Sequence, residues 1–97
     1  IVVDNATFGT IRMHQEREYP GRVSGTYLAN PDFAALARAY GWQAATVEHT
    51  EDFEPAFAAA LQAGRPNLLH LKLDPDVRHP RGTLTSIREA ALARQKG

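Results

Sequence analysis

The sequence has 97 residues, enough for one domain, and its 43% hydrophobic and 23% charged residues are typical of a soluble globular protein. Its net charge is zero and no apolar run approaches membrane-spanning length, so composition predicts binding neither to nucleic acid nor to a membrane. The absence of cysteine excludes a disulfide scaffold, a zinc ribbon and thiol catalysis, and it agrees with a cytoplasmic location.

Four segments are predicted in the first third of the chain. Residues 1–3 are an apolar, strand-favouring run, which predicts a strand buried on both faces. Residues 4–9 contain the turn formers Asp, Asn and Gly. A helix is expected over about residues 10–18, ended by the Pro-Gly pair that follows, and residues 21–29 are a predicted loop.

The next segment has the pattern of a helix followed by a strand. Asn30 is the expected N-cap, and Pro31 lies in the first turn, where its missing N–H costs nothing. An apolar stripe at helical spacing follows, made of Phe33, Leu36, Ala37 and Tyr40. Gly41 is expected to end the helix in a left-handed conformation, and residues 42–47 are a predicted strand.

A third helix is predicted to begin after Thr50, its expected N-cap, because the acidic residues that follow suit the positive end of a helix dipole. Its apolar residues share one face: Phe53, Ala56, Phe57, Ala60 and Leu61. Gly64 closes this helix. Within residues 67–73, leucines alternate with His70 and Lys72, which predicts a strand with one less-buried face.

The last quarter of the chain is predicted as a connection over residues 74–82, which holds two prolines, and an amphipathic helix that ends near Gln95. Strands that alternate with helices of this length predict parallel βαβ units with right-handed crossovers. We therefore expect an α/β fold, a partial doubly wound parallel sheet of about three strands with flanking helices. Because so thin a sheet leaves its edges uncovered, and the chain opens abruptly inside a strand, we expect half of a larger domain.

A binding site is expected where residues 4–9 follow the first strand, because open α/β sheets bind ligands beyond the carboxyl ends of their strands. The stretch IVVDNATFGTIRMHQ resembles the second half of the thiamine-diphosphate motif of acetolactate synthase-like and benzoylformate decarboxylase-like enzymes. That motif opens with Gly-Asp-Gly and ends in a hydrophobic strand closed by Asn-Asn, which is Asp4-Asn5 here. Further stretches are similar to the family in order and spacing: Phe8-Gly9, Ile11-Arg12, Gln15, and residues 30–41, 64–66 and 80–88.

The resemblance covers essentially the whole chain and implies that residues 1–97 are the C-terminal part of a thiamine-diphosphate-binding domain. The parent enzyme would act on 2-oxo acids by decarboxylation or carboligation. Magnesium, which favours oxygen ligands, would be held by the Asn5 side chain and the Thr7 main-chain carbonyl. Gly9 would let the backbone turn tightly beside the diphosphate. Thr10 is expected near the cofactor and His14 near the substrate, while no catalytic residue is expected in the chain.

The chain departs from the family at two places. Asp4 replaces the first Asn of the closing pair, but that position is not the expected direct ligand. The Gly-Asp-Gly half, whose aspartate would be the main anionic magnesium ligand, is not in these residues, and neither is the activating glutamate of a neighbouring subunit. We therefore expect the isolated chain to be inactive, and its partners to be the remaining domains of a parent chain in a homo-oligomer, a dimer or tetramer.

Two other classes of protein were weighed. Val2-Val3-Asp4 looks like the acidic strand end of a phosphoacceptor receiver domain, a signalling module, but residues 42–47 end in no clear aspartate and Lys72 lies within a strand. A stand-alone α/β interaction module without a site is the third interpretation. It predicts that the strand beginning at Ile1 is not an exposed edge.

The remaining histidines and the C-terminal arginines are given structural or surface roles. His49, His70 and His79 have no metal-ligand spacing and are taken as structural. The C-terminal segment is mildly basic because it carries Arg78, Arg81, Arg88 and Arg94. A solvated face is the preferred interpretation of these arginines, with contact to a nucleotide-like cofactor or another subunit as the alternative.

Overall fold

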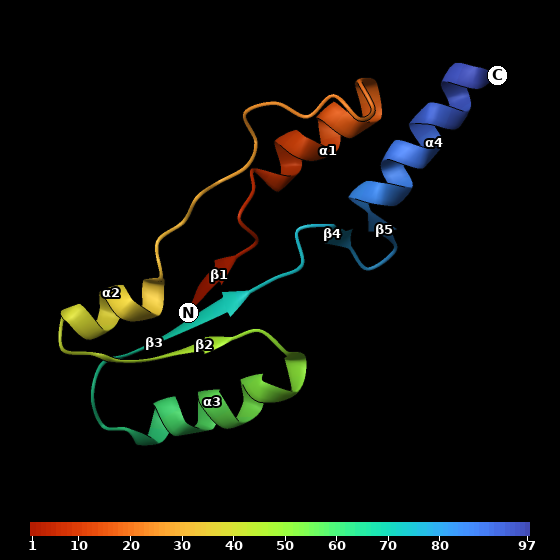
Figure 1. Ribbon diagram of the computed structural model, residues 1–97. Helices are drawn as coiled ribbons and strands as arrows, with labels where there is room; N and C mark the ends of the chain where they lie inside the picture. Colours follow the sequence, from red (N-terminus) through yellow and green to blue (C-terminus); the bar gives the residue numbers. More distant parts are fainter. The chain divides into compact units, whose positions relative to one another are not determined.

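In the computed structural model, which describes residues 1–97, the chain divides into two units. The first unit consists of Ile1–Asp4 and Asn30–Leu73, and the second of Asn5–Ala29 and Asp74–Gly97. Figure 1 labels the elements of both units along the chain. None of the helices is both long enough and apolar enough to span a membrane.

The first unit is built on a parallel sheet of three strands in the order β1-β3-β2 (Figure 1). Strand β1 is Val2–Asp4, β2 is Gln43–Val47 and β3 is Asn67–Lys72. Both outer strands pair with β3 in parallel. The predicted α/β class and the parallel pairing are confirmed, and the strand at residues 42–47 begins one residue later than predicted.

Two helices cover opposite faces of this sheet, α2 over Phe33–Ala39 and α3 over Thr50–Gln62 (Figure 1). The reason is the strand order. The connection from β1 to β2 passes over β3, and the connection from β2 returns to β3, so two right-handed crossovers place their helices on opposite sides. Strand β3 is therefore covered on both faces, and Leu69 and His70 are both buried. The predicted less-buried face of this strand is wrong, because a central strand has no solvent side.

The first turns of α2 and α3 differ from the prediction by one or two residues. Asp32, not Asn30, caps α2, and its carboxylate accepts a hydrogen bond from the Ala35 backbone N–H at 3.0 Å. This hydrogen bond holds the pKa of Asp32 below its usual value. His49 occupies the N-cap position of α3 without a side-chain hydrogen bond, so Thr50 is the first helical residue.

The ends of both helices agree with the prediction, but their apolar faces do so only in part. Gly41 and Gly64 follow α2 and α3 with φ of +80° and +62°, the left-handed conformation expected of them. Of the predicted apolar stripes, Leu36, Tyr40 and Leu61 are exposed by 48%, 79% and 71%. A sheet of three short strands is too narrow to cover the full width of either helix.

The second unit pairs two helices, α1 over Gly9–Glu18 and α4 over Leu84–Lys96, which pack against each other (Figure 1). Both were predicted to within a residue or two. An antiparallel hairpin precedes α4 in the chain. It consists of β4, Val77–His79, and β5, Gly82–Thr83. This hairpin lies largely in residues 74–82, which were predicted to be a connection without strands.

A buried carboxylate links the two helices of the second unit. The Glu16 side chain of α1 is completely buried, with one oxygen 3.4 Å from Arg12 Nε and 3.6 Å from Arg88 Nη1 of α4. Its other oxygen accepts a hydrogen bond from the Gly21 backbone N–H at 3.0 Å. Two cations and an N–H group thus compensate the buried charge.

Candidate functional site

The loop that leads into α1 is a tight turn around Asn5 and Thr7. The Asn5 Oδ1 atom accepts a hydrogen bond from the Thr7 backbone N–H at 3.3 Å, which is the geometry of an Asx turn. Between them, Ala6 has a φ of +53°, in the left-handed region that residues other than glycine rarely adopt. Such strain persists only where the surroundings enforce it, and it is commonly found at functional sites.

The same loop is fixed by pairing with a distant segment. Residues 6–8 lie antiparallel to residues 26–28, with the Phe8 N–H donating to the Thr26 carbonyl at 2.8 Å. The Thr7 hydroxyl donates to the same carbonyl at 2.7 Å, and Thr7 is buried. No backbone hydrogen bond of the loop ends on the Thr7 carbonyl oxygen.

Gly9 is the first residue of α1 and is packed against an arginine. A Cβ atom at Gly9 would lie 3.2 Å from Asn5 Nδ2 and 3.2 Å from Arg78 Cζ, and it would clash with Arg78 Nη1. Arg78 Nη2 donates to the Thr10 hydroxyl at 3.1 Å. The φ of Gly9 is not positive, so its backbone does not need the left-handed conformation that favours glycine, and its expected turn beside the diphosphate stays a prediction. A side chain at this position would have to displace the Arg78 guanidinium, which occupies the space beside Gly9.

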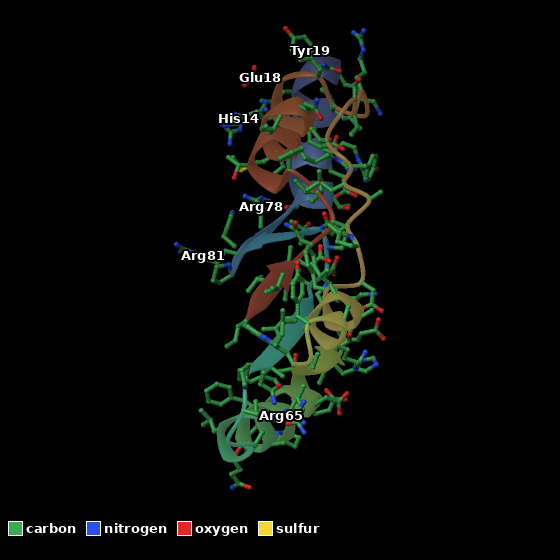
Figure 2. All side chains as sticks on the ribbon, turned by 90° about the vertical axis from the view of Figure 1, so that its left-hand side faces the viewer. His14, Glu18, Tyr19, Arg65, Arg78 and Arg81 are labelled. Atoms are coloured by element: carbon green, nitrogen blue, oxygen red, sulfur yellow. The ribbon has the colours of Figure 1, made fainter.

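Three of the predicted site residues, Asn5, Gly9 and Thr10, therefore meet around one guanidinium group. His14 lies one turn beyond Thr10 on the same side of α1, exposed and projecting outward (Figure 2). It makes no hydrogen bond to the loop, and its role near a substrate stays a prediction.

Arg78 is the residue that sequence reasoning misplaced. It was assigned with three other arginines to a solvated face. Arg81 and Arg94 are indeed exposed, but Arg78 and Arg88 are half-buried. The one sequence signal for Arg78 was its place in a basic segment. Its contact with Thr10 could not be read from the sequence, because the two residues are 68 positions apart.

The residues present fit a metal ion that carries a diphosphate. Asn5 Oδ1 and the Thr7 carbonyl are neutral oxygen donors of the kind that Mg²⁺ prefers. Beside them, the cationic Arg78 guanidinium fills the space next to Gly9, and the buried Nε of Arg78 has no hydrogen-bond partner. No group of three or more His, Asp or Glu residues is placed to hold a metal ion.

Asp4, which replaces the expected Asn, has its own partners in the first unit. Its Oδ2 lies 2.7 Å from Nε2 of His70, and its Oδ1 accepts a hydrogen bond from Asn30 Nδ2 at 2.7 Å. The predicted cap Asn30 is thus used to hold Asp4. The His70 ring is also packed edge-on against Phe33, with 5.1 Å between ring centroids. Both oxygens of Asp4 are engaged, which agrees with the expectation that Asp4 is not the metal ligand.

These contacts also bear on the two other interpretations. A receiver domain needs a free acidic cluster near a lysine, but Asp4 is paired with His70, and Lys72 Nζ lies 3.7 Å from a Glu48 carboxylate oxygen. A stand-alone module predicted that the first strand is not an exposed edge. Instead β1 is an edge strand, and Ile1 and Val3 are exposed by 66% and 62%.

Comparison with known proteins gives one consistent result. Residues 1–71 match the family described as thiamine pyrophosphate enzyme, C-terminal TPP binding domain. The chain is 33% identical over 75 residues to the acetolactate synthase isozyme 2 large subunit of Escherichia coli (strain K12), covering 76% of this chain and 14% of that protein.

Two further relatives agree. The acetolactate synthase large subunit of Parasynechococcus marenigrum (strain WH8102) is 35% identical over 71 residues, which cover 71% of this chain and 12% of that protein. The probable acetolactate synthase large subunit of Methanococcus aeolicus is 32% identical over 75 residues, which cover 76% of this chain and 12% of that protein. The chain thus spans roughly an eighth of the length of the curated relatives it matches.

Proposed function

Because the chain belongs to the thiamine pyrophosphate enzyme family, as a C-terminal TPP binding domain, we propose that its residues 5–10 bind the Mg²⁺–diphosphate end of thiamine diphosphate, the same compound as thiamine pyrophosphate. The metal ligands are the Asn5 side-chain oxygen and the Thr7 carbonyl oxygen. The observation that carries this proposal is the strained turn at Ala6, which leaves the Thr7 carbonyl without a backbone partner.

The parent enzyme acts on 2-oxo acids by decarboxylation or carboligation, as the names of the acetolactate synthase relatives suggest. When bound, the cofactor supplies carbanion stabilisation, which is the difficult part of that chemistry. The residues of this chain bind and orient the cofactor. Thr10, beside Gly9, lines the cofactor site, and His14, one turn further along α1, is placed towards the substrate.

The chain works as the C-terminal part of a larger cofactor-binding domain and is inactive by itself. Two observations support this. It matches 12–14% of the length of its relatives, and the apolar edge of β1 is free to pair with a further strand. The missing part supplies the acidic magnesium ligand from a Gly-Asp-Gly segment, and a homo-oligomer, a dimer or tetramer, supplies the activating glutamate.

The test is a thermal-shift measurement on the complete polypeptide that contains these residues. A ligand at about 100 times its dissociation constant stabilises the folded state by roughly 2.7 kcal/mol, so thiamine diphosphate with Mg²⁺ raises the Tm by several degrees. Neither compound alone gives the full shift, because the metal bridges the protein and the diphosphate. Absence of any shift at saturating cofactor and metal removes the proposal.

A matched pair of variants locates the site. Asn5→Ala removes the proposed metal ligand and reduces the shift, whereas Asn67→Ala, which removes an amide at the start of β3 in the first unit, leaves it unchanged. The isolated chain shows little or no shift. An equal response of the two variants contradicts the assignment of Asn5.

A further inference from the structure

Arg78 occupies a position that its immediate neighbours do not explain. It lies in the middle of β4, half-buried, and its guanidinium fills the space left by the missing side chain of Gly9. Figure 2 labels Arg78 on this hairpin, below α1 and on the side from which His14 projects. Only one hydrogen bond holds the guanidinium, from Nη2 to the Thr10 hydroxyl.

The charge of Arg78 is not compensated within the chain. A guanidinium has five N–H donors, and the Nε of Arg78 is buried without any partner. Arg78 takes part in none of the ion pairs, whereas Arg12 and Arg88 of the same unit share the carboxylate of Glu16. Burying unpaired donors of a charged group is costly, so a counter-anion at this place would be strongly favoured.

The neighbouring residues indicate which anion this is. The Cβ position of Gly9 is equally close, at 3.2 Å, to Arg78 Cζ and to Asn5 Nδ2, so the guanidinium and the Asn5 amide border the same space. A metal ion held by Asn5 would also take phosphate oxygens as ligands. A planar guanidinium fork matches two phosphate oxygens and forms charge-assisted hydrogen bonds to them.

We propose that Arg78 binds the diphosphate of the cofactor directly and that Gly9, which has no side chain, gives the guanidinium room to do so. This rests on the proposed function. Arg78 then supplies, from the hairpin after the sheet, a positive charge next to the metal, and the β4–β5 hairpin is part of the cofactor site. The hairpin lies beyond residues 1–71, which match the family.

The experiment measures binding of thiamine diphosphate, and of Mg²⁺ with inorganic pyrophosphate, by calorimetry of the complete polypeptide. Arg78→Gln removes the charge and the fork, and it is expected to weaken both bindings by about tenfold or more, the size of a charge-assisted hydrogen bond. Arg81→Gln is the matched control. Arg81 lies on the same hairpin, exposed, with its guanidinium in no hydrogen bond, so its loss leaves both affinities unchanged.

A second measurement uses the unmodified protein and does not depend on the folding of a variant. Phenylglyoxal, an arginine reagent, is applied with and without Mg²⁺ and pyrophosphate, and modified positions are located by mass spectrometry. The proposal predicts that pyrophosphate protects Arg78 and leaves the labelling of Arg81 unchanged. Equal labelling of Arg78 in both conditions overturns it.

The outcomes separate this inference from the proposed function. If the unmodified polypeptide binds thiamine diphosphate and a folded Arg78→Gln variant binds it equally well, Arg78 is not a diphosphate ligand, although the cofactor site stands. If that variant keeps its cofactor affinity but its KM for a 2-oxo acid rises, the anion is the substrate carboxylate and the proposal is wrong. If the unmodified polypeptide binds no cofactor, both fail.

Discussion

The carboxylate of Asp4 lies 2.7 Å from Nε2 of His70, and both side chains are almost completely buried. The second oxygen of Asp4 holds Asn30, so one carboxylate joins the end of β1 to the middle of β3 and to the segment before α2. This is a physical reason for an Asp at a position where the family has Asn. The acid thus contacts residues of the first unit, and in the proposed function its neighbour in sequence, Asn5, holds the metal.

The first prediction concerns this pair. His70→Phe keeps the aromatic contact with Phe33 but leaves a buried carboxylate oxygen without its partner, and we expect it to lower the free energy of unfolding by about 3 kcal/mol. Adding Asp4→Asn removes the unpaired charge, so the double variant is more stable than His70→Phe alone. Urea denaturation measures both. A double variant less stable than the single one contradicts the pairing.

The second prediction concerns the turn at Ala6. A β-branched side chain is poorly accommodated at positive φ, so Ala6→Val is expected to destabilise the protein by about 1–3 kcal/mol and to weaken Mg²⁺-dependent cofactor binding. Ala6→Gly accepts the same φ and is within about 1 kcal/mol of the parent. Equal cofactor affinities in the folded Val and Gly variants would show that the turn does not shape the site.

The third prediction concerns the contact between Gly9 and Arg78. Gly9→Ala places a Cβ in the guanidinium, so it is expected to displace Arg78 and to weaken cofactor binding about as much as Arg78→Ala does. In an Arg78→Ala background the added methyl group has space, and its further effect is small. A double-mutant cycle of dissociation constants measures this coupling. If the effects of the two substitutions on the dissociation constant are fully additive, the predicted coupling between Gly9 and Arg78 is contradicted.

The fourth prediction concerns Glu16 between the two helices of the second unit. Glu16→Ala leaves Arg12 and Arg88 without their shared carboxylate and is expected to cost about 3–5 kcal/mol of unfolding free energy. Glu18→Ala, two residues further along α1 and exposed (Figure 2), changes stability by less than about 0.5 kcal/mol. Comparable losses in both variants, measured by urea denaturation, would argue against a structural role of the buried carboxylate.

Much of the fold follows from local patterns in the sequence. The helix of residues 10–18 and the left-handed ends at Gly41 and Gly64 depend on neighbouring residues, and the structure has them where expected. The β4–β5 hairpin was missed because the two prolines of residues 74–82 favoured a connection. The burial of His70 on a second covered face was missed because it depends on strand order, which no local pattern contains.

The candidate site was likewise predictable where it depends on neighbouring residues, and not where it depends on contacts between distant parts of the chain. Asn5, Thr7 and Gly9 lie within one short motif, and the structure places them in the loop before α1 and at its first residue. Arg78 enters from 68 positions beyond Thr10. Side-chain contacts across such a separation exist only in the folded chain, and a basic segment of unremarkable composition gives no hint of them. For the same reason the packing of the Arg78 guanidinium beside Gly9 was not predictable from the sequence.

The central claim is that Asn5 and Thr7 hold the metal that carries the cofactor's diphosphate. A crystal structure of the complete polypeptide with thiamine diphosphate and Mg²⁺ tests it most directly. We predict the ion at about 2.1 Å from both Asn5 Oδ1 and the Thr7 carbonyl oxygen. A bound cofactor whose metal has neither atom in its coordination shell would contradict the account.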